Sequence, residues 1–431
     1  MKKLIILLLS AIPLLSFGQK IFTEDVNNFW NAYDKIVLEK DSLKQLDLIK
    51  NLYINKGTSG LEGIMRARRY SAEEYVYAIN HYPKFWQSVR NNTLKSKEIS
   101  KELVGGIEKL KEIYPNLKPV NIYFEIGILR TPGTAIDGMA VIGSEVALTN
   151  KSVITSEFDN VYPYLRTFFD TNPIKDVVFL NVHEYVHTQQ NLPVDNLLSY
   201  VIYEGVAEFV AVKALEISSP NPQIEFGKNN AEKIKLRFEE EMFYINNRGK
   251  WLWSNDSNEF GMRDLGYYVG YQMCENFYEQ AENKKGAIKT MIELDYTNDS
   301  EIDDFVKKSN YFLKSLDELY QNFEAKRPTV IGIKQFENNS KNVSPNIKEI
   351  TVEFSEPLNG RSTGVDFGDL GQDAFPKNDV TKRFWSEDRK SWTISVDLEP
   401  NKKYQILISN NFRTENGTPL KAFLIEFETG N

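Results

Sequence analysis

The chain has 431 residues, enough for two or three domains and a substantial apolar core. Hydrophobic residues make up 41% and charged residues 26% of the chain, as in ordinary globular proteins, which excludes an extensively disordered chain. The formal net charge is −8 and no block of Lys and Arg stands out, so we expect neither a nucleic-acid partner nor an anionic membrane partner.

The first eighteen residues have the pattern of a secretory signal peptide. A short basic start is followed by an apolar run, and Ser16 and Gly18 fit the small-residue positions of a signal-peptidase site. The apolar run is short for a membrane anchor, and polar sequence follows it at once. We therefore predict a signal peptide over 1–18 and an exported protein, periplasmic or extracellular, with no integral membrane segment after cleavage.

Residues 20 to about 115 are predicted to be helical, because their apolar residues recur at spacings of three and four. The period changes at "PVNIYFEIGIL" (119–129), which alternates and is rich in β-branched and aromatic residues, so a strand is predicted there. "TPGTAIDG" is a turn-rich break, and "MAVIGSEVAL" (139–148) is predicted as a second strand.

Two further helices are predicted in the middle of the chain. Asn172 and Pro173 offer an N-cap and a first-turn proline for a helix over about 173–190, and a second helix is predicted over about 197–217. Helical patterns continue to about residue 324. The chain up to this point is therefore predicted to be α+β, mostly helical with a small sheet.

The character of the sequence changes at Arg327. Short alternating runs such as "IKEITVEFSEPL", "KSWTISVDLEP" and "KKYQILISN" are separated by Asn, Gly, Pro and Asp turns, which is typical of an all-β sandwich of about 100 residues. We therefore predict two domains after the signal peptide, 19–326 and 327–431. Nothing in the second domain indicates catalysis.

Cys274 is the only cysteine, which excludes an internal disulfide. Its setting in "YYVGYQMCENFY" is the apolar face of a predicted helix. This setting indicates a small buried hydrophobic residue rather than a nucleophile.

Two of the three histidines stand four residues apart in "VVFLNVHEYVHTQQN" (177–191). On a helix of 3.6 residues per turn, His183 and His187 project from one face, so both imidazoles can bind one zinc ion. Glu184 is then set beside the metal, where it can take a proton from the water that the metal activates. The alternative is a core helix with two hydrogen-bonded histidines. The HExxH spacing favours the zinc site.

A zinc site needs a third protein ligand. The remaining histidine, His81, lies in a distant helical segment with no supporting motif, so a carboxylate is expected. The helix "LSYVIYEGVAEFVAV" offers Glu204 and Glu208, one turn apart in an apolar run where an unpaired carboxylate is costly. One of them is expected to bind zinc and the other to support a ligand or the fold.

"HEYVH" followed by "EGVAEF" resembles the gluzincin peptidases, such as the aminopeptidase N group. In that family the glutamate of an EG-x-A motif is the third zinc ligand. The resemblance implies that Glu204 is the ligand and that Glu208 lies behind it.

The stretches "GTAIDGMAVIGSEVAL", "HEYVHTQQN", "YEGVAEFV" and "DLGYYVGYQMCENFY" are similar, in that order, to an exported bacterial family of predicted zinc-dependent proteases. This family is catalogued mainly as a domain of unknown function. The resemblance implies a zincin-like metallopeptidase fold. In such folds the strand before the active-site helix often pairs with an extended substrate, which makes 139–148 the candidate strand; an ordinary internal strand is the alternative.

A zinc peptidase also needs a donor for the oxyanion that forms on the attacked carbonyl. With histidine so scarce, a tyrosine or an arginine must serve, and "MRDLGYYVGY" offers several. Tyr267 and Tyr271 share a helical face and are our candidates, with core packing as the alternative for either one. Asp264 is a candidate partner for the free ring nitrogen of a zinc-binding histidine.

Residues 327–431 resemble the SbsA-type bacterial Ig-like domain through "RPTVIGI", "ITVEFSEPLN" and "NGTPLKAFLIEFETG". The resemblance implies an accessory module that spaces, stabilises or docks the enzyme to the envelope or to a partner protein.

The sequence as a whole predicts an exported zinc metallopeptidase of the gluzincin type, acting on a peptide or protein substrate, with Glu184 as general base. Two alternatives stay open at this point. One is a non-catalytic zinc-binding envelope or structural protein, and the other is a zinc hydrolase of non-peptide substrates. An intact Glu184 argues against the first alternative, because a structural site has no need of that acid.

Overall fold

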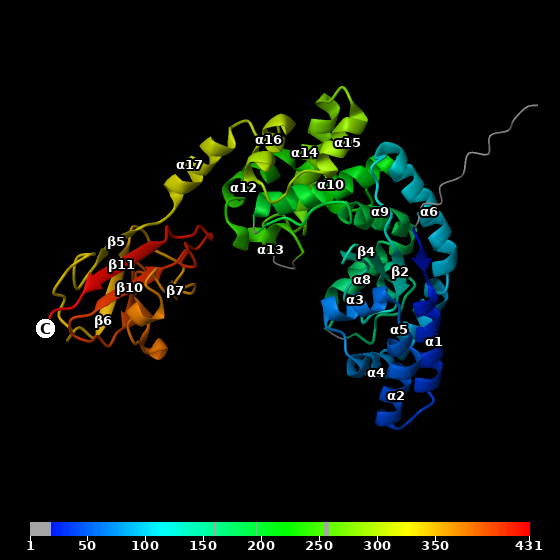
Figure 1. Cartoon of the computed structure of the whole chain (residues 1–431), viewed down its shortest axis with the longest axis horizontal. Coiled ribbons are helices and arrows are strands. Elements are labelled where there is room, and N and C mark those ends of the chain that lie inside the picture. Colours follow the sequence, from blue (N-terminus) through cyan, green and yellow to red (C-terminus); the bar gives the residue numbers. More distant parts are fainter. Residues whose placement is uncertain (1–18, 159–160, 195, 254–257) are drawn as a thin grey trace, which may run out of the picture. The chain divides into compact units, whose positions relative to one another are not determined.

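A computed structural model of the protein describes residues 19–158, 161–194, 196–253 and 258–431 (Figure 1). The predicted signal peptide, 1–18, lies outside the described residues. The chain divides into two compact units, each made of two segments. The first unit comprises the chain up to Phe238 together with Ile245–Leu313. The second unit comprises Glu239–Tyr244 and Lys314–Asn431. The protein is α+β, as predicted, with many helices, several small sheets, and strands in its C-terminal part.

The N-terminal part of the first unit is helical, as the apolar spacing predicts. The ends of several helices are fixed by local side chains; at α4, for example, Ser71 and Glu74 hydrogen-bond each other's backbone N–H groups in a capping box. A two-residue strand at the start of the described chain was not predicted. The elements are β1 (Ile21–Phe22), α1 (Glu24–Ile36), α2 (Ser42–Leu52), α3 (Ser59–Arg68), α4 (Ala72–His81), α5 (Pro83–Thr93) and α6 (Ser96–Ile113).

The sheet of the first unit has the strand order β1-β2-β4-β3. Both predicted strands are present but shorter, as β2 (Ile122–Glu125) and β4 (Met139–Gly143), and they pair in parallel. The segment that we interpreted as a turn-rich break contains a further strand, β3 (Thr134–Ile136), which pairs antiparallel with β4. Asp137 and Gly138 join the two strands with φ values of 48° and 70°, the pair of positive angles that a type I′ hairpin turn requires.

Of the two alternatives for 139–148, a substrate-pairing edge strand and an ordinary internal strand, the strand order supports the internal strand. Strand β4 has β2 on one side and β3 on the other, so its backbone is already paired along both edges. The edge strand is β3. The rest of the predicted strand is helical, because α7 (Ser144–Ala147) begins directly after β4.

Helices α9 (Val177–His187) and α10 (Leu197–Leu215) confirm the two predicted central helices, with tighter bounds. Asn172 does not cap α9: Pro173 begins a short 3₁₀ turn instead, and α9 starts four residues later. Helix α9 contacts β3 and β4 as well as α6 and α10. This burial explains why its sequence is apolar on nearly every face.

Helices α10 and α14 (Leu265–Gln280) cross at van der Waals distance because a glycine from each helix meets at the crossing. A Cβ atom added at Gly205 would lie 2.1 Å from the backbone carbon of Gly270. Close packing therefore accounts for the glycine of "EGVAEF".

The remaining helices of this unit are α8 (Pro163–Asp170), α11 (Pro222–Asn229), α12 (Ala231–Glu241, whose last residues belong to the second unit), α13 (Arg248–Trp251), α15 (Lys284–Ile292) and α16 (Asp299–Ser309).

The second unit consists of helix α17 (Leu316–Lys326) and two antiparallel sheets that share one apolar core around Trp392 and Phe412. The strand orders are β5-β6-β9-β8 and β11-β10-β7. Helix α17 belongs to this unit, because rings of α17 contact Phe243, whereas the sequence placed the domain boundary after this helix. The predicted boundaries and the Ig-like assignment stay predictions. The strands are β5 (Val330–Ile333), β6 (Glu349–Phe354), β7 (Val365–Asp366), β8 (Phe384–Trp385), β9 (Ser391–Ser395), β10 (Lys403–Ile408) and β11 (Phe423–Glu428).

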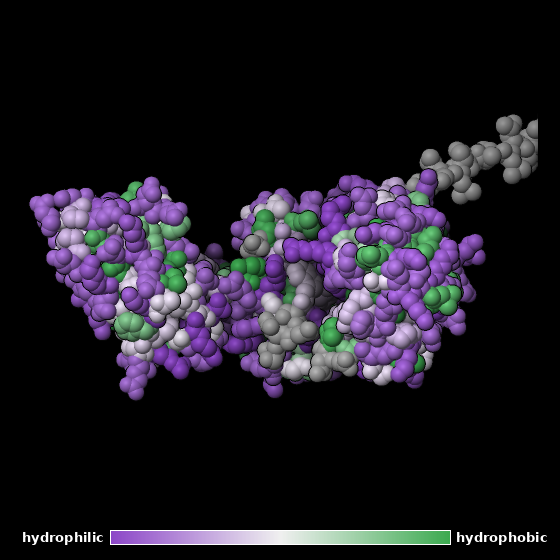
Figure 2. All heavy atoms as spheres, turned by 90° about the horizontal axis from the view of Figure 1, so that it is seen from below, coloured by the Kyte–Doolittle hydropathy of each residue, from purple (hydrophilic) through white to green (hydrophobic). Residues whose placement is uncertain are grey.

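Among the described residues, no helix is both long enough and apolar enough to cross a bilayer. The face drawn in Figure 2 is mainly hydrophilic, with apolar residues in small separate patches. Cys274 is fully buried in α14, and burial raises the pKa of its thiol well above the ordinary value. The interpretation of this residue as a small buried hydrophobic residue is confirmed.

Two glutamates of the sheet region are fully buried without a basic partner. Glu145 accepts hydrogen bonds from the backbone N–H groups of Gly127 and Leu129, whereas neither carboxylate oxygen of Glu125 has a hydrogen-bond partner. Burial raises the pKa of Glu145 to about 7, and burial followed by the nearby charge of Glu145 raises the pKa of Glu125 well above its ordinary value. Burial in the folded chain therefore favours the neutral, protonated form of Glu125.

Gly205→Ala is expected to lower the free energy of unfolding by about 1–3 kcal/mol, because the added methyl group forces α10 and α14 apart. Gly105→Ala in α6 is the matched control: a Cβ atom there meets nothing within 4 Å, so the variant should be more stable by roughly 0.5–1 kcal/mol. Urea unfolding of both variants measures the difference. Equal stability of the two variants would contradict the tight crossing.

Glu125→Gln is expected to stabilise the protein at high pH. In the native protein this carboxyl keeps its proton to a higher pH than in the unfolded chain, so stability is lost as the pH rises above about 4.5. The variant has no proton to lose and should therefore be more stable than the native chain at pH 8, while the difference in the free energy of unfolding narrows at pH 5. Urea unfolding at both pH values tests this, with the exposed Glu108→Gln as a control for removal of a charge. A gap that does not change with pH would show that Glu125 is ionised in the native state.

Candidate metal centre

Three predicted ligand residues converge between helices α9 and α10. The Nε2 atoms of His183 and His187 lie 3.0 Å apart, and Oε2 of Glu204 lies 3.4 Å from the first and 3.2 Å from the second. All three residues are buried. They form a group that could hold a metal ion, and within the described part of the chain it is the sole group of three such residues with converging ligand atoms.

The size of this group fits zinc. In a tetrahedral site with bonds of about 2.0–2.1 Å, neighbouring ligand atoms lie about 3.3–3.4 Å apart, close to the distances measured here. Calcium prefers six to eight oxygen ligands at about 2.3–2.6 Å, so two imidazole nitrogens and one carboxylate oxygen suit it poorly. The donor set and its spacing therefore favour a zinc-type ion.

The outer ring nitrogen of His187 is held by Gln190, a residue that we did not predict. The amide nitrogen of Gln190 donates to the carbonyl oxygen of Tyr203 and to the hydroxyl of Tyr296, at 3.1 and 2.7 Å. Its amide oxygen must then face Nδ1 of His187, at 2.8 Å, and accept a hydrogen bond. Because Nδ1 carries the proton, the lone pair of Nε2 is directed to the centre of the group. The sequence "HEYVHTQQ" places Gln190 three residues after the second histidine, and this spacing could have indicated its role.

Glu208 performs the same task for His183, as the prediction of a supporting glutamate anticipated. Its Oε2 atom lies 3.1 Å from Nδ1 of His183. Two residues of the loop after α10 hold the carboxylate in place: Ser219 donates to Oε1, and Asn221 donates to Oε2 at 2.9 Å. The fully buried charge of Glu208 is thereby compensated on both oxygens.

The electrostatics of the group favour binding of a cation. Burial lowers the pKa of His183, but the hydrogen bonds with Glu204 and Glu208 outweigh it and raise that pKa to about 10. Burial also opposes ionisation of Glu204, yet the charge of His187 and hydrogen bonds with both imidazoles hold its pKa well below the ordinary value. Glu204 would therefore offer a metal ion an anionic oxygen, and His183 would offer an unusually basic nitrogen once it loses its proton.

Glu184 differs from its neighbours in being partly exposed, whereas both flanking histidines are buried. A Cβ atom built on Gly133, directly before β3, would lie 3.7 Å from Cγ of Glu184. The carboxylate therefore lies beside the edge strand of the sheet. It is the one residue of the HExxH motif that is not buried.

Tyr267 reaches the metal group from α14. Its ring stacks on His183 with ring centroids 6.0 Å apart, and its hydroxyl accepts a hydrogen bond from the indole of Trp253 at 3.2 Å. Burial raises the pKa of Tyr267 well above its ordinary value, and the charges of Glu204 and Asp264 add to the rise. The hydroxyl therefore stays protonated and able to donate.

The other candidates lie elsewhere. Tyr271 donates to Glu275 at 3.2 Å and packs on the ring of Phe209, away from the histidines, so its predicted catalytic role has no support in the geometry. Asp264 accepts hydrogen bonds from the backbone N–H of Trp253 and from Arg263, at 2.7 and 2.5 Å, rather than from a histidine. Glu208 and Gln190 lie at the Nδ1 atoms of His183 and His187, where Asp264 was considered as a partner.

His81 also lies outside the group, as the sequence led us to expect. Its ring stacks on Tyr77 with centroids 3.8 Å apart, and its Nδ1 atom lies 2.9 Å from the carbonyl oxygen of the same residue. These contacts lie within α4. His81 is therefore not placed to be the third ligand, and Glu204 is the residue that lies beside the two other histidines.

No family model and no curated protein matches the chain. Among solved structures, a crystal structure of the S-layer protein rSbsC is 13% identical over 66% of this chain and 39% of that one, with a TM-score of 0.18. A structure of domains 1-6 of the surface layer protein SbsC is 12% identical with the same coverage and TM-score. The chain thus spans about two fifths of the length of these structures. Similarity at this level carries no argument about fold or function.

Gln190→Leu is expected to weaken zinc binding by about 10–100-fold, the usual cost of losing the partner of a metal-binding histidine. Gln189→Leu is the matched control, because the neighbouring amide contacts Lys118 and Thr188 and no metal ligand. Competition with a chelating dye measures both affinities. Equal zinc affinities of the two variants would contradict the orienting role of Gln190.

Proposed function

We propose that the protein is a zinc-dependent metallopeptidase of the gluzincin type, exported from the cell. The observation that carries the proposal is the convergence of His183, His187 and Glu204 at 3.0–3.4 Å, with Glu184 beside them at the edge of the sheet. His183, His187 and Glu204 would hold the ion. A bound zinc ion supplies Lewis acidity, which acidifies a water molecule and polarises the carbonyl group under attack.

Glu184 is the general base of the proposed reaction. It is the accessible carboxylate of the site, whereas Glu204 and Glu208 are buried and engaged by histidines. Glu184 accepts a proton from the attacking water and passes it to the amine that leaves. A site that only stabilised the fold would not need a free carboxylate in this position, which argues against the structural alternative.

Tyr267 is the proposed oxyanion donor. Its ring lies over His183, and its hydroxyl is fixed from behind by the indole N–H of Trp253. The hydroxyl proton is then free to be donated to the negative oxygen that forms on the carbonyl. This assignment selects one of the two tyrosines that the sequence offered.

A peptide substrate is favoured by the position of β3. This strand is the edge of its sheet and is paired only with β4 among the strands of the described chain, and Gly133 at its start lies beside Glu184. An extended peptide that pairs with the free edge of β3 is carried past the general base. A non-peptide substrate would make no use of this arrangement.

His187→Ala is expected to abolish stoichiometric zinc, since the site then has two ligands instead of three. Glu184→Gln should keep the zinc and lose activity by about 10²–10⁴-fold, because the amide cannot accept the proton. Elemental analysis and cleavage of a peptide library measure the two properties. Full zinc in the first variant would refute the site, and full activity in the second would refute the mechanism.

Tyr267→Phe is expected to lower kcat by about 10²–10³-fold with little change in KM, as for other oxyanion donors. Tyr268→Phe is the matched control, because this neighbouring ring packs against Gly227 on another side of α14. Steady-state kinetics on one cleaved peptide compare the two. A loss of equal size in both variants would point to packing of α14 rather than to oxyanion stabilisation.

A further inference from the structure

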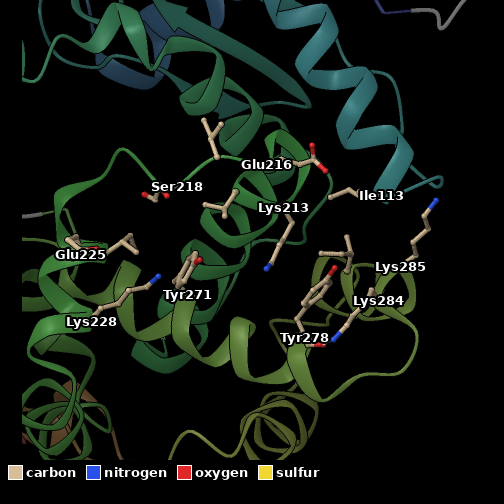
Figure 3. A pocket seen from close by; sticks show the side chains of 15 residues that line it. Ile113, Lys213, Glu216, Ser218, Glu225, Lys228, Tyr271, Tyr278, Lys284 and Lys285 are labelled. Carbon is tan, nitrogen blue, oxygen red and sulfur yellow. Dashed lines mark hydrogen bonds between the residues drawn. The ribbon is translucent and has the colours of Figure 1, made fainter.

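A cavity lies in the first unit, beside α10 and α14. Its volume is about 640 Å³, and it lies between α10, α11, α14 and α15, with the loop after α10 at one wall. Tyr271 and Tyr278 line its centre together with Lys213 (Figure 3). None of the residues that line it is a proposed zinc ligand or the proposed base.

The charges of this cavity are unbalanced. Its lining contains four lysines and two glutamates, Glu216 and Glu225, and neither glutamate forms an ion pair with the lysines. Two of the lysines share one carboxylate from outside the lining: Glu279 lies 3.7 Å from Lys213 and 3.8 Å from Lys284.

The other two lysines, Lys228 and Lys285, form no ion pair with a carboxylate of the described residues. Lys228 lies at one end of the cavity, over the ring of Tyr271 at 5.3 Å, and Lys285 lies at the rim of the other end (Figure 3). Both side chains are exposed. When Glu279 is counted with Glu216 and Glu225, the four lysines leave an excess of one positive charge, which suits a small ligand that carries negative charge.

The same cavity reaches the metal centre through one side chain. Ser219 lines the cavity, and its hydroxyl donates to Oε1 of Glu208, the carboxylate that holds His183. Asn221 holds the other oxygen of Glu208, and its own backbone N–H donates to the hydroxyl of Ser219 at 3.0 Å. A ligand that displaces the loop containing Ser219 would therefore change the hydrogen bonds that hold Glu208, and Glu208 in turn holds the proposed zinc ligand His183.

We infer that this cavity is a binding site for a small organic anion, and that occupancy of the site alters zinc binding through Ser219 and Glu208. The binding claim stands on the cavity alone. The coupling claim rests on the proposed function of His183 as a zinc ligand. A carboxylate or a phosphate group would each satisfy the ammonium groups, so both are tested.

Binding is measured by calorimetry with succinate and with inorganic phosphate, using His187→Ala so that neither probe can be bound by the metal centre. Succinate, phosphate or both should bind with a Kd of about 1 mM or lower, whereas neutral succinamide should not. The stronger of the two probes identifies the anionic group. The double variant Lys228→Gln with Lys285→Gln should weaken binding at least tenfold.

The exposed pair Lys101→Gln with Lys109→Gln in α6 is the matched control and should leave the affinity unchanged. Acetylation of lysines, read by mass spectrometry, should show that the bound anion protects Lys228 and Lys285 but not Lys101. Equal binding of succinamide and succinate, or unchanged affinity in the cavity variant, would overturn the site. Absence of binding by both anions would overturn it as well.

Coupling is measured as the zinc affinity of the native chain with and without the anion, against a blank that corrects for zinc in solution. We expect a change of at least about fivefold, and Ser219→Ala should remove the change while anion binding persists. An unchanged zinc affinity in the presence of bound anion would overturn the coupling. If the chain binds no zinc, the ring resonances of His183 report the same coupling, and their failure to shift on anion binding overturns it.

Discussion

Two carboxylates buried one turn apart on a single apolar helix determine how the first unit is built. A buried charge without a partner costs several kcal/mol, so α10 is stable only where other elements supply partners for Glu204 and Glu208. Both histidines of α9 meet this need from one side, and the loop after α10 meets it from the other. The relative position of α9 and α10, and with it the metal group, follows from this requirement. Removal of either partner leaves a charge inside the protein.

The neighbouring face of α10, which meets α14, is determined by side-chain size rather than by charge. Gly205 sits next to Glu204 in the sequence and lets α14 approach at backbone distance. This close crossing brings Tyr267 over His183, and it also sends Tyr271, one turn later, past the crossing and onto Phe209. The close approach at Gly205 therefore places Tyr267, and not Tyr271, beside the metal group.

The parts that the sequence predicted well are those fixed by local spacing. His183, Glu184 and His187 share a face because of the helical repeat, and Glu204 and Glu208 do so for the same reason. Helical spacing alone could not decide between the two glutamates, because the choice depends on how α9 and α10 pack against each other. The resemblance to known peptidases indicated Glu204.

The parts that the sequence missed depend on contacts between distant segments. Gln190 is informative only once Tyr203 and Tyr296 are seen to fix its amide. Strand β3 has three residues in a segment rich in turn formers, and its pairing with β4 is what makes it a strand.

The single thiol of the chain makes it a convenient protein for site-directed labelling. Maleimides and related reagents attack thiolates, and Cys274 is fully enclosed in α14 with its pKa raised well above the ordinary value by burial. The folded protein should therefore leave such reagents unreacted. A cysteine introduced at an exposed position of either unit would then accept a fluorophore or spin label at that position alone. Spectroscopic distances can thus be recorded without first removing a native residue.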